Sequence, residues 1–518
     1  MGFKMFSRKE TAILSGFSLF AFLIRIPLAL RPIRALAGFP YGDDAFYLFS
    51  IAKHFAAGQG FSVDGLHLTN GFQPLVVLLY APIFWLCGTN AWLAVRWTLI
   101  LNGVIAALFV WAVAAFIRTI ERAPNPKSVS IPVVAAALWT FTYPLFVQMA
   151  NGLETSLASL LLLIALILYA KESSKQEDVP STGVADAPSR WWLLGIVLGF
   201  TVLARIDAAI FVAILVLLLF LRKQPRAAMV TGAIAFLISL PWWIFNWVYF
   251  GSLMPTSGQA ENIWPLPPHE NIYRATQAVS GILSLVFYLP HSLSFLASVC
   301  WLLMLLAGIV FLTYRAHLTD NIRRLLLRMN ALVPLAIFSI TLFFYYTFFF
   351  RAPHFLERYF QPARILWSIL AAAGAGILWR EKRARTLLIA AAIIGLAFSI
   401  DRFAADYYLV SRTSDFYDMG GWANAHPNEK IGMLQSGIAS FVAPNIINLD
   451  GKVNADALRA HQQGRLADYL RDQHFTYIAD EKPFIEDIAA IARKDKLFFD
   501  STGMIGHIQL MKRRDDSE

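Results

Sequence analysis

The sequence predicts a polytopic α-helical membrane protein that carries a small α/β domain at its C-terminal end. The first observation is composition: 57% of the 518 residues are hydrophobic and only 15% are charged, and the mean hydropathy of +0.55 is too high for a soluble globular protein. The second is a series of apolar runs that approach or exceed the ~18–20 residues needed to span a bilayer. The third is the change to Gly, Asn and charged residues after Asp401.

Eleven apolar segments are expected to cross the membrane. They lie near 11–31, 92–117, 129–148, 154–171, 191–204, 207–222, 227–249, 294–314, 329–350, 363–379 and 386–402. The first follows MGFKMFSRKE and lacks a clear small-residue cleavage site, so it is expected to remain as a helix. Segment 75–88 is apolar, but it is short and Pro82 splits it.

The distribution of basic residues decides how segment 75–88 lies. If this segment does not cross, the N-terminus and five later loops share one side and carry most of the Lys and Arg outside the tail, whereas the opposite loops carry few. The positive-inside rule then places the N-terminus in the cytoplasm and residues 403–518 outside. We therefore expect 75–88 to lie along the outer interface. The predicted domains are a transmembrane domain, 1–402, and a soluble outer domain, 403–518.

The first outer loop, 32–91, opens on two adjacent carboxylates, Asp43 and Asp44. A tandem acidic pair at the end of a membrane helix is costly to place and points to function. Residues 44–57 follow it with a helical apolar stripe, which predicts an amphipathic helix lying on the membrane. The stripe consists of Ala45, Leu48, Phe49, Ala52, Phe55 and Ala56.

Residues 190–223 must cross the membrane twice in about 34 residues, so their junction at 204–207 should lie below the outer surface. An intramembrane Arg205 and Asp207 need a polar cavity or each other. In the tail, β-like runs at 430–435, 446–450, 477–479 and 507–511 alternate with helical patterns, notably 454–473, which predicts a small α/β domain.

The polar residues of the outer loops are the candidates for chemistry. Outside the cytoplasm a transferase needs a donor that is already activated, and a sugar linked to a polyprenyl phosphate meets this need. Such a reaction requires a base near the acceptor hydroxyl, for which Asp43 or Asp44 is suited, and cations near the phosphate. The candidates for binding phosphate or sugar are Lys53, Asn70, Gln73, Glu154, Arg205, Asp207, His354, Arg358 and Tyr359.

Simpler structural roles remain open for several of these residues. Asp44 can act as a helix N-cap, Glu154 can favour a helix dipole, and Arg205 with Asp207 can form a buried ion pair without a ligand. A transporter or flippase of lipid-linked sugars, or a glycan-binding assembly protein, is also compatible with a set of charged outer loops. The polar residues gather at the outer end only and no internal repeat is visible, which disfavours transport.

Five short motifs carry a resemblance to a known family. They are DDAFY at 43–47, AAGQGF at 56–61, TNGFQPLV at 69–76, NGLET at 151–155 and ARID at 204–207, and INLDGKVN at 447–454 adds a sixth phrase in the outer domain. Together they resemble the GT-C superfamily of integral membrane glycosyltransferases. The relatives meant are lipid A aminoarabinose transferases, protein O-mannosyltransferases and cell-wall arabinofuranosyltransferases.

The resemblance implies transfer of a sugar, with inversion, from a polyprenyl-phosphate donor at the outer face of a bacterial inner membrane. Asp43 matches the essential first-loop acid of the family. Gln73 and Phe46 stand where the aminoarabinose transferases have basic residues, so phosphate charge must be met elsewhere. No cofactor is required; a divalent ion on Asp43, Asp44 and Glu154 is left open. The sugar is open among arabinofuranose, aminoarabinose, mannose and a uronic acid, and the acceptor among lipid, polysaccharide and protein. No nucleic acid is expected as a partner.

Overall fold

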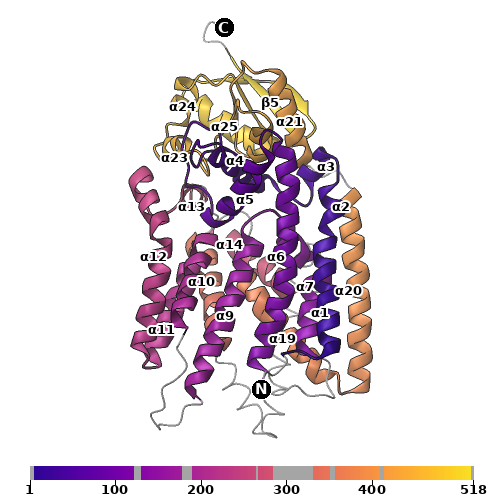
Figure 1. The fold of residues 1–518 in the computed structure, drawn as a ribbon. Coiled ribbons are helices and arrows are strands. Elements are labelled where there is room, and N and C mark those ends of the chain that lie inside the picture. The colour runs from indigo at the N-terminus through magenta and orange to yellow at the C-terminus, as the bar shows by residue number, and fades with distance from the viewer. Residues whose placement is uncertain are drawn as a thin grey trace.

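The computed structural model describes residues 5–121, 130–177, 190–263, 267–283, 331–350, 356–408 and 413–514. Within these ranges, seven helices are long and apolar enough to cross a membrane, or eight when the bent pair α7 and α8 counts as one span. Figure 1 shows these long helices side by side, with the C-terminal sheet and its helices at one end. We call this the outer end of the helical bundle.

The helices of the bundle overlap the predicted segments, except α14, which no predicted segment covers. The predicted crossing at 294–314 lies outside the described residues. The observed helices are α1 (Arg8–Leu23), α2 (Arg25–Ala29), α6 (Ala91–Ile120), α7 (Ile131–Phe141), α8 (Tyr143–Ala150), α9 (Thr155–Glu177), α10 (Trp191–Ala204), α11 (Ala208–Leu221), α12 (Pro225–Phe250), α14 (Pro268–Leu283), α17 (Val333–Phe344), the π-helix η3 (Tyr345–Phe350), α19 (Gln361–Leu378) and α20 (Lys382–Tyr408).

In the short helix pair α10 and α11, α10 packs closely on α12. Each helix of the pair has 14 residues, about 21 Å at 1.5 Å per residue, which is shorter than the hydrocarbon core. A Cβ atom at Gly195 or Gly199 of α10 would press on Ile234 or Ile238 of α12. These glycines let the two backbones approach closely, as small residues do in membrane helix pairs. The two charged side chains at the 204–207 junction are only 14% and 8% exposed, so the junction lies within the bundle; its depth below the membrane surface stays a prediction.

Short helices fill the outer end: α3 (Ile33–Gly38), α4 (Asp43–Ala56), α5 (Pro74–Cys87), α13 (Thr256–Ala260) and α18 (Leu356–Tyr359). Figure 1 shows α4 and α5 between the long helices and the C-terminal sheet. The prediction that α4 lies on the membrane as an amphipathic helix is wrong in one respect. Ala45, Leu48, Phe49 and Ala52 of the predicted stripe are buried, whereas Phe55 is exposed. Phe46, Tyr47 and Ile51, outside the stripe, are buried as well, because the C-terminal domain covers the other side of this helix.

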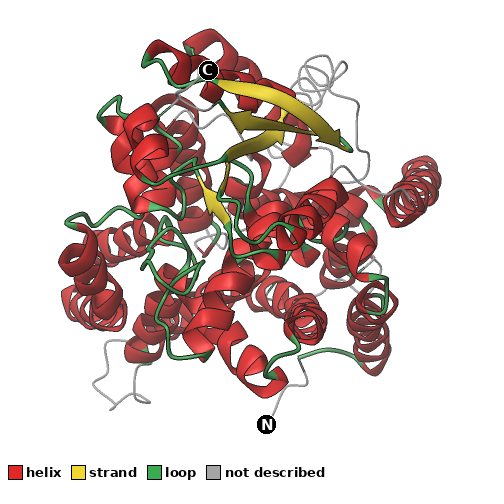
Figure 2. Cartoon of the chain, turned by 90° about the horizontal axis from the view of Figure 1, so that it is seen from above, coloured by secondary structure: helices red, strands yellow, loops and turns green. Residues whose placement is uncertain are grey.

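The C-terminal domain is built on a five-stranded sheet with the order β2-β1-β3-β5-β4. β1 pairs in parallel with β2 and β3, while β5 runs antiparallel to β3 and β4. In the view from above, the sheet covers only part of the bundle (Figure 2). The elements are α21 (Thr413–Ala425), β1 (Ile431–Met433), α22 (Gly437–Val442), β2 (Ile446–Asn448), α23 (Ala455–Gln462), α24 (Leu466–Asp472), β3 (Tyr477–Glu481), α25 (Lys482–Lys494), β4 (Phe499–Ile505) and β5 (Ile508–Arg513).

Four predicted strands coincide with β1, β2, β3 and β5, but two details differ from the sequence prediction. The predicted helix 454–473 is split into α23 and α24 at Gly464, whose φ of +67° suits glycine. Strand β4 was not predicted because most of its residues are exposed, so it lacks the apolar alternation of a half-buried strand.

One hydrophobic core joins the bundle to the C-terminal domain. Phe441 of α22 contacts Phe46 of α4 and Trp92 of α6, with ring centroids 5.4 and 5.1 Å apart. Arg34 of α3 adds a bidentate ion pair with Asp418 of α21. The C-terminal domain is therefore packed directly on the first outer loop.

Candidate active site

A cleft at the outer end of the bundle combines an apolar wall with two guanidinium groups. It lies where α9, α10, α11, α17 and α19 meet, near the junction between α10 and α11. Its polar lining residues are Thr155, Ser159, Thr201, Arg205, Asp207, Arg358 and Gln361, and its apolar ones are Ala158, Leu162, Ala208, Phe338, Leu342 and Pro362. This lining suits a ligand in which an apolar part is joined to an anionic end.

Arg205 is fixed by carboxylates on two sides. Its Nε and Nη2 atoms donate to the two oxygens of Asp207 at 3.1 and 2.5 Å, and Nη1 donates to Oε1 of Glu154 at 3.0 Å. The Tyr346 hydroxyl donates to Asp207 at 2.7 Å. The three charged side chains are only 8–14% exposed. The predicted ion pair therefore exists, and Glu154 completes it.

Arg358 lies beside Arg205 because both contact one aromatic ring. The guanidinium carbons are 5.4 Å (Arg358) and 5.6 Å (Arg205) from the centre of the Tyr359 ring. Tyr359 stacks in turn on Tyr346, with centroids 4.2 Å apart and planes 9° apart. A cation is attracted to the face of an aromatic ring, so this stack holds two positive charges at the same end of the cleft.

The adjacent carboxylates Asp43 and Asp44 contact different partners. Successive residues of a helix point about 100° apart, and both residues lie in the first turn of α4. Asp44 accepts a hydrogen bond from Nη1 of Arg358 at 2.9 Å. Asp43 accepts from the backbone N–H groups of Gly437 and Ile438 at 2.9 and 2.7 Å. Asp44 thus connects the acidic pair to the cleft, and Asp43 connects it to α22.

Burial raises the pKa of Asp43 to about 7, against the lowering effect of the two backbone hydrogen bonds; the charges of Asp44 and Asp450 raise it further. A carboxyl group that titrates near neutral pH is suited to proton transfer. Of the acidic pair, Asp43 therefore has the properties expected of a general base.

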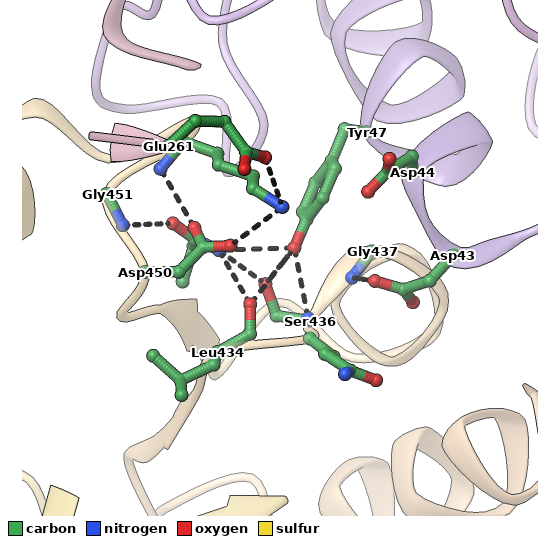
Figure 3. Close-up of polar contacts among 12 residues, drawn as sticks. Asp43, Asp44, Tyr47, Glu261, Leu434, Ser436, Gly437, Asp450 and Gly451 are labelled. Atoms are coloured by element: carbon green, nitrogen blue, oxygen red, sulfur yellow. Dashed lines mark hydrogen bonds and ion pairs between the residues drawn. The ribbon is translucent and has the colours of Figure 1, made fainter. Parts of the chain in front are cut away.

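Tyr47, one turn after Asp43, anchors the same side of α4 to the C-terminal domain. Its hydroxyl lies 3.1 Å from the Ser436 hydroxyl, and accepts from Nδ2 of Asn448 at 3.1 Å and from the Ser436 N–H at 3.0 Å. Figure 3 shows Asp43 and Tyr47 both directed at the segment around Ser436 and Gly437. The hydrogen bonds of Tyr47 and Asp43 to the segment 436–438 hold the start of α4, and with it the acidic pair, in one orientation.

Three charged residues near this site were not predicted as site residues. Nζ of Lys452 lies 3.1 Å from Oε1 of Glu261 and 3.7 Å from Oδ2 of Asp450. Figure 3 shows Asp450 and Glu261 facing each other beside Tyr47. The phrase INLDGKVN contains two of these residues, but sequence alone does not show that its loop folds back onto the first outer loop.

The remaining predicted residues have varied positions. Gln73 accepts from the Ile206 N–H at 3.1 Å and Asn70 accepts from the Thr256 N–H at 3.0 Å, so both join outer loops to each other. Nζ of Lys53 lies over the Phe441 ring at 5.4 Å, away from the two arginines. His354 lies outside the described residues.

The carboxylates considered for a divalent ion do not form one ligand set. Asp43 binds α22, Asp44 binds Arg358 and Glu154 binds Arg205. Across the part of the chain that the structure describes, no three His, Cys, Asp or Glu side chains are placed to hold a metal ion. These residues do not fit a metal centre, and no chemical step is assigned to one.

Comparison with known proteins shows the fold. No protein-family model and no curated protein sequence matches the chain. ArnT from Cupriavidus metallidurans bound to undecaprenyl phosphate is similar in structure, with a TM-score of 0.55 and 11% identity over 98% of each chain. The archaeal oligosaccharyltransferase AglB from Archaeoglobus fulgidus, in complex with an inhibitory peptide and a dolichol-phosphate, has a TM-score of 0.57 and 15% identity over 98% of this chain and 75% of its own.

A further structure of the Archaeoglobus fulgidus oligosaccharyltransferase, in complex with Zn and sulfate, has a TM-score of 0.51 and 16% identity over 94% of this chain and 72% of its own. ArnT and AglB are GT-C superfamily membrane glycosyltransferases. The chain therefore has a GT-C fold, a multi-pass helical bundle with a C-terminal α/β domain, as its motifs predicted.

Proposed function

We propose that this chain is a membrane glycosyltransferase. It transfers a sugar from a polyprenyl-phosphate donor to an acceptor hydroxyl at the extracytoplasmic face, with inversion at the anomeric carbon. The observation that carries the proposal is the cleft in which Arg205 and Arg358 lie at one end of an apolar wall. The apolar wall has the chemistry to receive the first part of a polyprenyl chain, and guanidinium groups are the preferred partners of a phosphate.

In the proposed reaction, Asp43 takes the proton of the acceptor hydroxyl, and Asp44 orients Arg358. Each Asp43 oxygen accepts one backbone hydrogen bond and keeps a second lone pair for the incoming proton. The acceptor oxygen bonds to the anomeric carbon while the bond from that carbon to the phosphate oxygen breaks. The polyprenyl phosphate leaves as an anion that Arg358 and Arg205 stabilise, so no general acid is needed.

The comparison supports this proposal at the level of fold and ligand class. One structural neighbour binds undecaprenyl phosphate and another binds a dolichol-phosphate. We further propose a bacterial inner-membrane location with a cytoplasmic N-terminus and an extracytoplasmic C-terminal domain. The positive-inside rule supports this orientation, and the two described ends of the chain lie at opposite ends of the bundle (Figure 1).

The test is a transfer assay with purified protein and candidate lipid-linked sugars, which measures released polyprenyl phosphate. We expect Asp43→Asn to lower turnover by about 100-fold or more, the contribution of a general base, while binding of undecaprenyl phosphate persists. The matched control is Asp64→Asn, in the same loop, whose carboxylate only bonds local groups such as His67. Full turnover in Asp43→Asn refutes the assignment of the base. Parallel assays with EDTA test dependence on a divalent ion.

A further inference from the structure

A loop of the C-terminal domain, residues 450–452, lies directly against the first and fourth outer loops. A Cβ atom at Gly71 would overlap the carbonyl oxygen of Lys452, so only glycine permits this approach. The same carbonyl accepts a hydrogen bond from the Thr256 hydroxyl at 2.8 Å, and the Lys452 N–H donates to Asp450 at 2.8 Å. The backbone of Lys452 is therefore held at a defined place in the outer end.

The Lys452 backbone lies next to the chain segment that reaches Arg205: it meets Gly71, and Gln73, two residues further on, accepts the N–H of Ile206 beside Arg205. The Lys452 side chain is 20% exposed and pairs with Glu261. Burial alone would lower its pKa, but the charges of Asp450, Asp44 and Glu261 raise it on balance. The charges of both Lys452 and Glu261 also act on the Tyr359 hydroxyl. Lys452 thus belongs to the same group of charges as Asp44 and Arg358, although it comes from another domain.

Arg205 and Lys452 differ in how firmly their present partners hold them. Arg205 makes three hydrogen bonds to Asp207 and Glu154 inside the bundle, and breaking such a buried pair is costly. The Lys452 ammonium group is instead a compact charge on a flexible stem, which can turn from one anion to another. The pairing of Lys452 with Glu261 gives it a resting position when no other anion is bound.

We propose that Lys452 binds the phosphate of the polyprenyl-phosphate donor, so that the C-terminal domain supplies a third cation to the site. This inference rests on the proposed function for its ligand class. Glu261 holds Lys452 in the absence of the donor, and the incoming phosphate replaces Glu261. The C-terminal domain is then part of the donor site and not only a platform for the acceptor.

The test uses the full chain in lipid nanodiscs and measures its binding of undecaprenyl phosphate, with the uncharged undecaprenol as a reference ligand. We expect Lys452→Gln to weaken binding of undecaprenyl phosphate at least about tenfold and to leave undecaprenol unchanged. Lys452→Arg should retain most of the affinity. The matched control is Lys482→Gln, which removes an exposed lysine from the same domain, 3.8 Å from Glu486.

Glu261→Gln separates a ligand role from a structural one. This change breaks the same ion pair but keeps the cation, so phosphate should bind at least as tightly as it binds the wild type. Equal losses of binding in Lys452→Gln and Glu261→Gln would overturn the proposal, as would unchanged binding in Lys452→Gln. If Lys452→Gln alone does not fold, the double variant with Glu261→Gln carries the same test, because the nearer carboxylate of the ion pair is then uncharged too and Asp450 keeps the hydrogen bond from the backbone N–H of residue 452. A wild-type protein that binds undecaprenyl phosphate but transfers no sugar refutes the proposed function and leaves this inference standing.

Discussion

At the scale of single residues, the site depends on two neighbouring carboxylates with different partners. Asp44 bonds Arg358 beside the cleft, whereas Asp43 bonds two backbone N–H groups of α22. In the proposed reaction, Asp44 acts on the donor side through Arg358, and Asp43, whose pKa is raised to about 7, is the base. One helix turn directs the two carboxylates toward these different partners.

Turnover should follow the ionisation of Asp43. Its pKa is raised to about 7, and only the ionised form can accept a proton. We expect kcat/KM to rise with pH up to about 7 and to level off above it. Because the charge of Asp44 raises this pKa, Asp44→Asn should move the inflection to lower pH. A pH–rate profile from pH 5 to 9 measures both effects.

Asp500→Asn is the control for this profile. Asp500 pairs with Arg514 on the surface of the C-terminal domain, so this substitution should leave the inflection in place. A profile that stays flat between pH 5 and 8 in the wild-type protein contradicts the role of Asp43.

At the scale of elements, glycines set how closely the C-terminal domain approaches the first outer loop. A Cβ atom at Gly437 would overlap the backbone oxygen of Asp43, and one at Gly71 would overlap that of Lys452. Gly71 lies in the TNG motif, so the close contact with Lys452 explains why this motif has a glycine. It allows two loops from different domains to pack backbone against backbone.

Gly71→Ala should separate these loops. Overpacking of this kind costs about 1–3 kcal/mol, and we expect a lower unfolding midpoint together with faster proteolysis of the C-terminal domain. The control is Gly421→Ala in α21, where a Cβ atom meets nothing within 4 Å and alanine favours the helix. Equal protease resistance in the two variants would show that the contact at Gly71 is not needed for docking.

At the scale of the whole molecule, Asp43 joins the bundle to the C-terminal domain, and two further buried carboxylates, Asp450 and Asp480, lie within that domain. Burial raises the pKa of Asp43 and Asp480 to about 7 and that of Asp450 to about 6. The folded state therefore binds protons more strongly than the unfolded chain, whose aspartates titrate near 3.9. The stability that these groups contribute is complete below about pH 4 and is lost as the pH rises to about 7.

We expect the unfolding midpoint of the full chain to fall between pH 5 and pH 7 for this reason. In Asp43→Asn the side chain cannot ionise, so its midpoint should fall less over the same range. Thermal unfolding in nanodiscs at several pH values measures the difference between variant and wild type. A difference that is the same at pH 5 and pH 7 would contradict the docking role of Asp43.

The sequence by itself determined the fold class and the positions of most of the long helices; the outer location of the polar residues stays a prediction. An apolar run is a property of one short stretch of sequence, so segments such as α10 and α11 can be found from their composition. The sequence also predicted that Arg205 and Asp207, two charges in so apolar a stretch, need a polar cavity or each other, and the structure pairs them. Strand β4, whose residues are mostly exposed, carries no such local signal.

Only the tertiary structure decided which charges meet. Asp44 and Arg358 are more than 300 residues apart in the chain, and the contacts of Asp43 with α22 and of Lys452 with Glu261 also join distant segments. The tertiary structure also buries residues of α4 outside the predicted apolar stripe, such as Phe46, since α22 covers them. Long-range contacts depend on how whole helices and strands pack against one another. The sequence pattern of one segment does not indicate which other segment will cover it.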